Sequence, residues 1–510
     1  MTFISGARRI ALLAGTALAL TAGPALAQDA AAPETTEARI ARLEATLAEL
    51  QGQLADLKAA STASVGQVRA AQQATTVSLN NGRPTIATGD GEFTAAFRGV
   101  FQLDGAIYSQ DDPGPLATDF RRGSFNDAGE NDHARDLSDG FNFRRVRLGV
   151  EGKAFGDFEY NFLYDFGGSG VEEGGKISAA WVQYNGFGPV KLRVGAFPPV
   201  TSLEDAASNA SSLFGERASV AETVRGVAGG DGRTAVALLG GGERWTFSAA
   251  VTGNVIGTST FDEQTGFVGR FTYVPYRRTD ALIHLGVNTT LVFNPAASGP
   301  DVGPAGAVTN LRLRDRPELR VDGARLVDTG NIDADGLTSI GGEFGAQYKN
   351  LYVQAEYFDI GVERRNRALP DPEFSGWYVQ GSWILTGEKR RYSATNAGFD
   401  GPRAAKPFNL KEGTWGAWEL AVRYSNLDLN FLETALPAAG SIRGGEQDIL
   451  SIGVNWYVNN GVTLQAAYRN VSVDRRSPGG AAFVAGSTPP LNAQVGQDLE
   501  IFSFRTQYAF

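Results

Sequence analysis

The chain has 510 residues, no cysteine and a formal net charge of −10. The missing cysteine excludes disulfides, cysteine catalysis and thiolate metal sites, and the acidic balance disfavours nucleic acid as a partner. With 64 glycines, 10% aromatic and only 20% charged residues, the composition is typical of many strands and turns and argues against a helical bundle.

Residues 1–27 predict a secretory signal peptide. Arg8 and Arg9 precede an apolar run, and residues 25–27 (Ala-Leu-Ala) form a small-x-small cleavage site. The apolar run is shorter than the roughly 20 residues that a spanning helix needs, so we expect no transmembrane helix. Removing the segment changes the formal charge from −10 to −12, because it holds two arginines and no acidic residue.

Residues 35–60 predict a short amphipathic helix. Its apolar residues recur at spacings of three and four, as in a coiled coil: Ile40, Leu43, Leu47, Leu50, Leu54 and Leu57. A helix this short is marginal in water, so the stripe favours self-association, with packing against the rest of its own chain as the alternative. Residues 61–91, rich in Ser, Ala, Gln and Thr, are expected to be a linker.

From residue 92 to the C-terminus the pattern changes to a period of two. About sixteen such segments follow one another, and each has an apolar face and a face that carries charged residues. The last segment, 501–510, places aromatic residues on one face, and alone it would also fit the edge strand of a soluble sheet. So many charged residues cannot point into a packed core. We therefore predict an all-β transmembrane barrel of about 16 antiparallel strands in domain 92–510, around a water-filled channel.

The connections between these segments alternate in length, as an outer-membrane barrel requires. Short turns should face the periplasm, and long polar loops should face outward or fold inward. The long loops are expected near residues 105–140, 199–232, 292–337, 428–446 and 473–497. Residues 387–414 do not fit, because they are long where a short periplasmic turn is expected, which suggests a misplaced strand.

Several motifs occur in a fixed order between about residue 92 and the C-terminus. They are Asn142-Phe-Arg-Arg-Val-Arg-Leu148, Leu192-Arg-Val-Gly195, Leu385-Thr-Gly-Glu-Lys-Arg-Arg-Tyr392, Gly416-Ala-Trp-Glu-Leu420 and Gly453-Val-Asn-Trp-Tyr457. With the closing aromatic residue, the set resembles the phosphate-selective porin O and P family. The resemblance implies a homotrimeric, sixteen-stranded porin of the Gram-negative outer membrane whose third long loop, about 199–232, narrows the barrel. It also implies that the barrel assembly machinery reads Tyr508 and Phe510 as an assembly signal.

Cations on the predicted inward face are candidate anion ligands, because guanidinium groups can grip two phosphate oxygens at once. They are Arg98, Arg145, Arg147, Lys191, Arg193, Arg270, Arg423, Arg469 and Arg505, and Arg144 completes an arginine pair implied by the family. The alternative is that they pair with inward acidic residues across neighbouring strands. Those residues are Asp104, Glu151, Glu159, Asp165, Glu343, Glu356 and Glu419.

The predicted constriction loop departs from the family pattern. Phosphate-selective members carry lysines where this sequence has Asp205 and Ala210, and the other charged candidates in the loop are Glu204, Glu216 and Arg217. Such a change alters the potential in a narrow pore by several kT. We expect passive diffusion of small hydrophilic solutes, with anions such as phosphate favoured. The alternative is a general or carbohydrate-permeable porin without phosphate selectivity.

Two other classes of protein compete with a porin. An enzyme would need a nucleophile beside a base, and the chain has only two histidines, His133 and His284, so we expect no enzyme and no cofactor. Acidic residues beside His133 (Asp127, Glu130 and Asp132) could hold a divalent cation, but such a loop is usually solvated or bridged to lipopolysaccharide, and we expect no metal site. A structural tether would use the N-terminal coiled coil, placed in the periplasm. The expected partners are two further copies of the chain, outer-membrane lipid and lipopolysaccharide, the assembly machinery and small anions.

Overall fold

The computed structural model describes residues 35–80, 82–110, 137–168, 175–300, 308–435, 439–477 and 491–510. The chain forms two compact units, Met1–Gln72 and Gln73–Phe510. The predicted signal peptide and the acidic segment around His133 lie outside the described residues. The signal peptide, and the expectation that the acidic segment holds no metal ion, therefore remain predictions.

The described part of the first unit is one long helix, α1 (Thr36–Gln73). It runs beyond residue 60, so the linker expected from residue 61 was wrong at its start. Alanine and glutamine are good helix formers and no proline interrupts this stretch, which explains the extension. The apolar stripe is 49–73% exposed in the single chain. Among the described residues, no helix is long and apolar enough to cross a membrane.

The rest of the expected linker contains a hairpin. β1 (Thr76–Asn80) and β2 (Arg83–Ala87) pair antiparallel. β2 also pairs antiparallel with the first residues of β3. Each strand is only five residues long, too short for its alternation to stand out from a polar segment.

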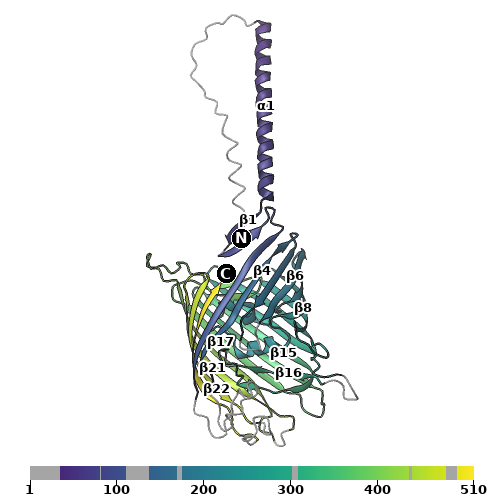
Figure 1. The fold of residues 1–510 in the computed structure, drawn as a ribbon, viewed down its shortest axis with the longest axis vertical. Helices are drawn as coiled ribbons and strands as arrows, with labels where there is room; N and C mark the ends of the chain where they lie inside the picture. Colours follow the sequence, from purple (N-terminus) through teal and green to yellow (C-terminus); the bar gives the residue numbers. More distant parts are fainter. Residues whose placement is uncertain are drawn as a thin grey trace. The chain divides into compact units, whose positions relative to one another are not determined.

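Within the described residues, sixteen antiparallel strands close into a barrel (Figure 1). Each pairs with the next, and the last pairs with the first, which confirms the predicted fold class. The strands are β3 (Thr94–Gln110), β4 (Gly140–Ala154), β5 (Phe158–Asp165), β6 (Lys176–Phe187), β7 (Val190–Ala196), β8 (Arg233–Gly241), β9 (Trp245–Val255), β10 (Thr265–Arg277), β11 (Ala281–Asn294), β15 (Ile332–Tyr348), β16 (Leu351–Arg364), β17 (Glu373–Ile384), β20 (Ala417–Phe431), β21 (Ile442–Tyr457), β22 (Val462–Asp474) and β23 (Asp498–Ala509).

The alternation along each strand separates the two faces of the wall. On β20, Leu420, Val422 and Tyr424 are exposed on the outer surface, whereas Glu419 and Arg423 are buried on the inner one. The outer row suits lipid, and the inner row can be buried only because other charged and polar groups meet it inside the barrel.

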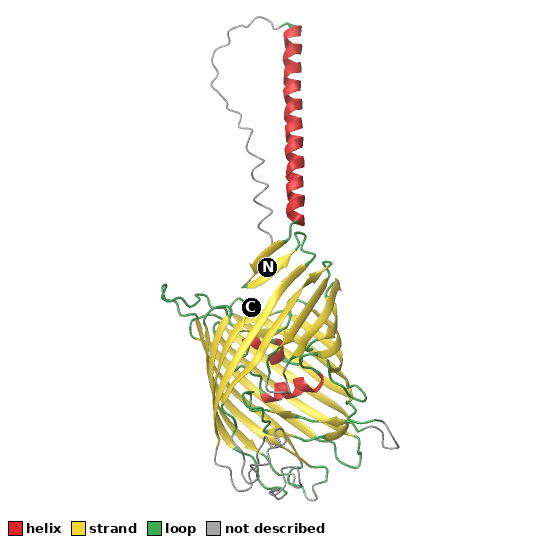
Figure 2. Cartoon of the chain, viewed as in Figure 1, coloured by secondary structure: helices red, strands yellow, loops and turns green. Residues whose placement is uncertain are grey.

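Residues 197–232, called the inner loop from here on, enter the barrel. They contain α3 (Leu203–Ala206), a 3-10 turn η2 (Asn209–Ser211) and α4 (Ser219–Ala228), which Figure 2 shows as helices within the ring of strands. The loop expected to narrow the barrel therefore folds inward.

The long connection between Ile384 and Ala417 also folds inward, and it replaces no strand. The strands on both sides, β17 and β20, lie where the alternation placed them and pair directly. The connection instead holds a small hairpin, β18 (Arg391–Ser393) and β19 (Gly398–Asp400), and β19 contacts α3. Segments that start from opposite ends of the barrel thus meet in its interior.

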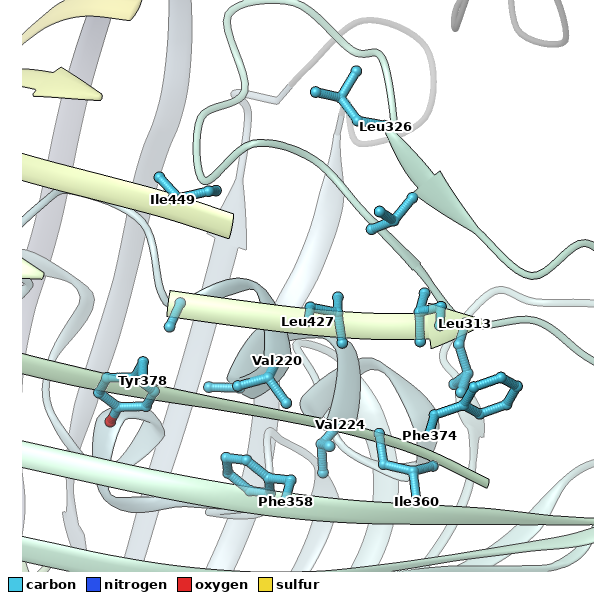
Figure 3. Close-up of a cluster of buried hydrophobic side chains, with 14 of the residues drawn as sticks. Val220, Val224, Leu313, Leu326, Phe358, Ile360, Phe374, Tyr378, Leu427 and Ile449 are labelled. Atoms are coloured by element: carbon cyan, nitrogen blue, oxygen red, sulfur yellow. The ribbon is translucent and has the colours of Figure 1, made fainter. Parts of the chain in front are cut away.

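The expectation of a fully water-filled channel needs a correction. A buried apolar cluster lies in the interior of the barrel, against the inner face of the wall. There Val220 and Val224 of α4 pack against Phe358 of β16 and Leu427 of β20 (Figure 3). Leu313 of the connection between β11 and β15 joins it. Some inward positions are therefore apolar, because they carry a packed loop and do not face water.

Candidate functional site

The wall holds the inner loop by its backbone. Six carbonyl oxygens of the loop, those of Ala210 and of residues 212–216, accept hydrogen bonds from inward side chains of β20 to β23. The donor and acceptor residues are Gln507 with Ala210, Gln465 with Ser212, Asn455 with Leu213, Arg469 with Phe214, Arg505 with Gly215 and Arg423 with Glu216, at 2.6–3.1 Å. Three arginines that we predicted as anion ligands therefore anchor the loop: Arg423, Arg469 and Arg505.

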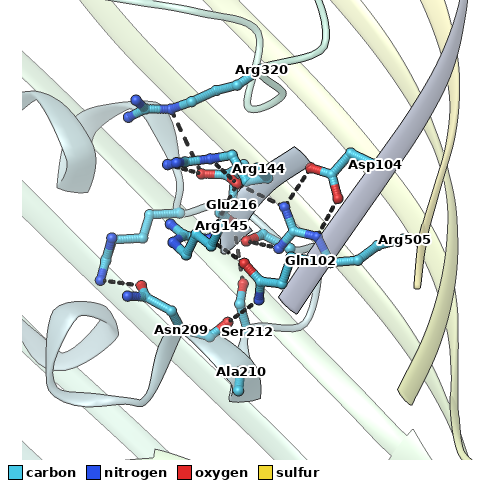
Figure 4. A network of polar contacts seen from close by, with 12 residues as sticks. Gln102, Asp104, Arg144, Arg145, Asn209, Ala210, Ser212, Glu216, Arg320 and Arg505 are labelled. Carbon is cyan, nitrogen blue, oxygen red and sulfur yellow. Dashed lines mark hydrogen bonds and ion pairs between the residues drawn. The ribbon is translucent and has the colours of Figure 1, made fainter. Parts of the chain in front are cut away.

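The tip of this anchored segment places the Glu216 carboxylate among arginines of the wall (Figure 4). Arg144 donates to both of its oxygens, at 2.8 and 3.1 Å, and Arg505 Nη2 donates at 2.8 Å. Arg145 and Arg320 approach within 3.6 and 3.8 Å. Burial alone would raise the pKa of Glu216, but these arginines outweigh it and hold the pKa well below its ordinary value.

Gly215 allows the loop to approach the wall this closely. Its φ is +79°, and a Cβ at this position would lie 2.8 Å from the Arg505 guanidinium carbon. A larger residue would therefore be strained and would push the following Glu216 away from the wall.

The anions predicted at the constriction are neutralised. Asp205 pairs with Arg217 at 2.9 Å and with Arg225 at 2.6 Å, and Glu204 accepts a 2.6 Å bond from Arg423. Burial raises the pKa of Glu204 although Arg423 opposes the shift. The charge of Asp205 is therefore paired, because α4 brings Arg225 beside it.

Most of the other wall arginines pair with acidic side chains, which is the alternative that the sequence left open. Arg98 pairs with Glu151 at 2.8 Å and Arg270 with Glu343 at 2.8 Å. Arg193 donates to Gln183 and stacks on the Trp181 ring, 4.1 Å from its centroid, while Lys191 is half-buried beside it on β7. The remaining acidic candidates are also engaged: Asp104 with Arg505, Asp165 with Arg147, Glu159 with Gln183, Glu356 with the Leu203 and Glu204 amides, and Glu419 with Arg390.

A cavity of about 440 Å³ lies between β4, α4 and residues 310–325, and we call it the basin. Among the described residues, eleven Lys and Arg side chains line it against four Asp and Glu. The cations are Arg144, Arg145, Arg147, Lys176, Arg225, Arg233, Arg312, Arg314, Arg316, Arg320 and Arg325, and the acids are Asp165, Glu222, Asp231 and Asp315. A lining with this excess attracts anions.

The comparison with protein families decides the class of protein. The family model for phosphate-selective porin O and P matches residues 116–510. The chain belongs to this family, as its motifs predicted. This porin of the outer membrane is 28% identical to Porin O of Pseudomonas aeruginosa over 402 residues, which cover 76% of the chain and 85% of that relative.

Solved structures with a similar fold include OmpT of Vibrio cholerae, with a TM-score of 0.44 and 11% identity over 82% of the chain and 99% of that structure. An anion-selective porin from Comamonas acidovorans has a TM-score of 0.45 and 11% identity over 82% and 100%. The outer membrane channel DcaP of Acinetobacter baumannii has a TM-score of 0.43 and 12% identity over 83% and 99%.

Most basin arginines of the porin were missed by sequence reasoning. Five of them belong to residues 312–325, which we expected to be an ordinary polar loop. The signal was present as alternating arginines at 312, 314 and 316, but only the fold brings them inside: β12 (Asn310–Leu311) pairs with β15, and β13 (Arg314–Asp315) pairs with β14 (Val327–Asp328). Burial, and then repulsion from Glu222, raise the pKa of Asp315 to about 7.

Proposed function

We propose that this porin passes small hydrophilic anions, phosphate among them, by passive diffusion. The proposal rests on the lining of the basin, in which eleven cationic side chains outnumber four acidic ones among the described residues. Long-range attraction concentrates anions at such a site. The name of the family, phosphate-selective porin O and P, agrees with this selectivity.

The pairing of the wall arginines with acidic side chains favours diffusion of an anion over its tight binding. Arg270 and Arg423, both fully or almost fully buried, already use their donors on Glu343 and on Glu204 and Glu318. A channel must release its ion as readily as it binds it, so partly neutralised arginines suit diffusion. A general or carbohydrate-permeable porin is the alternative function.

Current through planar bilayers tests the proposal. In a salt gradient the reversal potential should report anion preference, and phosphate should reduce the chloride current, because both anions use the basin. Cation preference would contradict the proposal. Anion preference with no response to phosphate would leave an anion channel and would remove phosphate from its solutes.

We also propose a homotrimer whose N-terminal helices form a coiled coil in the periplasm. The support is the stripe from Ile40 to Leu57, whose six apolar side chains are 49–73% exposed in the single chain. Such a stripe on a long helix usually meets a partner helix. A tether to other layers of the cell envelope is the alternative use of the same helix.

The remaining expectations also stand as proposals. The protein acts as a channel and not as an enzyme: His284 is fully buried, with its ring nitrogens 2.9 Å from the Tyr392 hydroxyl and 3.3 Å from Glu343. Tyr508 points outward on the closing strand, and with Phe510 it would be presented to the assembly machinery. Lipid and lipopolysaccharide would contact the outer surface of the barrel.

A further inference from the structure

The surroundings of Glu216 have the form of an oxyanion site. Arg144 from β4 and Arg505 from β23 donate to the carboxylate, and Arg145 lies 3.6 Å away. Planar guanidinium groups that converge on one point are how proteins hold phosphate and other oxyanions. Here the occupant is a side chain of the protein itself, delivered by the inner loop.

Arg145 retains a donor for a further anion. Its side chain is 3% exposed, and Gln102 accepts from its Nη1 at 2.8 Å. Its Nε is buried and has no hydrogen-bond partner among the described residues. A buried donor without a partner costs free energy that a bound oxyanion would recover.

Arg145 also borders two cavities inside the barrel. It lines the basin on one side and, on the other, a small cavity of about 20 Å³ next to Ser208, Gly215 and Arg390. Arg144 and Arg320, which also contact Glu216, line the basin as well. The site around Glu216 therefore borders both the basin and this second, small cavity.

We propose that Glu216 is a tethered anion, which occupies an oxyanion site of Arg144, Arg145 and Arg505 and competes there with the solute anion. This inference rests on the proposed function, because it requires an anionic solute. Competition weakens binding of the solute anion at this site. Weak binding is what a diffusion channel needs to release its ion.

Phosphate block of the chloride current tests the competition. Glu216→Gln should lower the half-blocking phosphate concentration by about tenfold or more, since hydrogen bonds to charged groups contribute on the order of this factor. Glu222→Gln is the matched control. It removes the same charge from the same loop, where Glu222 also contacts arginines and lines the basin. An equal effect of both variants would overturn the proposal, because it would show only a change in overall potential.

Glu216→Asp covers the case in which the glutamine variant fails to fold. It keeps the charge but withdraws the carboxylate by one methylene, so phosphate should still bind more tightly than in the wild type. Wild-type block by phosphate in the aspartate variant would overturn the proposal.

Thermal unfolding provides an independent readout. Added inorganic phosphate should raise the Tm of Glu216→Gln more than that of the wild-type porin, because the vacated site binds phosphate in the folded state. A lowered Tm that phosphate does not restore would show that Glu216 is only a structural counter-ion and would overturn the inference. The proposed function would stand in that case if the wild type still prefers anions.

Discussion

At the scale of residues, the lumen arginines have different tasks although they share one face. Arg505 donates to a loop carbonyl and to two carboxylates, so few donors remain for a solute, whereas the Nε of Arg145 has no hydrogen-bond partner in the part of the chain that the structure describes. The alternation placed Arg145 and Arg505 on the inward face, but it did not predict that the adjacent Arg144 is also buried there. It could not predict partners such as Arg505 and Glu216, which are 289 residues apart, because a period of two carries no information on what crosses the lumen.

Gly215 should not tolerate a side chain. Gly215→Ala is expected to destabilise the porin by about 1–3 kcal/mol, because φ is +79° and the new Cβ would meet Arg505. Denaturation midpoints measure the loss. Gly226→Ala is the control: it lies in α4, with nothing within 4 Å of its added Cβ, and alanine favours helix. Equal stability of the two variants would contradict the account of the turn.

Asp315 should make selectivity depend on pH. Its pKa is raised to about 7, so it is neutral in mildly acid solution and adds a negative charge to the basin above neutrality. The ratio of anion to cation permeability should therefore fall between about pH 6 and 8. The same shift predicts that stability falls as pH rises from the ordinary pKa of 3.8 towards 7, because the folded state holds the proton longer.

Asp315→Asn is the control for the pH dependence. It keeps the shape of the side chain and removes its proton equilibrium, so reversal potentials measured across the same range should become flat. A variant that retains the full pH response would show that another group in the basin titrates.

At the scale of elements, periodicity identified every spanning strand of the described residues, and the family resemblance identified the loop that folds inward. It missed the end of α1, the β1–β2 hairpin and the inward course of residues 385–416. Short strands have too few alternations to be recognised. The inward course depends on contacts such as Phe399 against Tyr352, with ring centroids 4.8 Å apart, which form only when the barrel is closed.

The helix should hold copies of the chain together without affecting the pore. Replacing Leu47 and Leu54 by Asn removes apolar side chains from the stripe, so the heat-stable oligomer should be lost while single-channel conductance persists. Gel mobility of unheated samples measures the loss. Gln51→Asn with Gln53→Asn, in the same helix but off the stripe, should leave the oligomer intact. Loss in both double variants would indicate that helix stability, and not the stripe, is responsible.

At the scale of the whole molecule, an acidic protein has an anion-attracting interior. The net charge of −10 gives no hint of this, because selectivity follows the few charges that line the path. The sequence predicted the barrel, its family and inward arginines. It did not predict that the basin would draw five arginines from residues 312–325, since the connection between β11 and β15 is placed by packing of Leu313 and its neighbours inside the barrel.

The reversal potential in a salt gradient tests whether the basin makes this porin anion-selective. We expect anion preference in the wild type and a clear loss of it when Arg312, Arg314 and Arg316 are replaced by glutamine. Replacing Arg365 and Arg367, which pair with Asp333 and Asp335 and do not line the basin, should leave the potential unchanged. Cation preference in the wild type, or equal potentials in the wild type and the basin variant, would contradict the account.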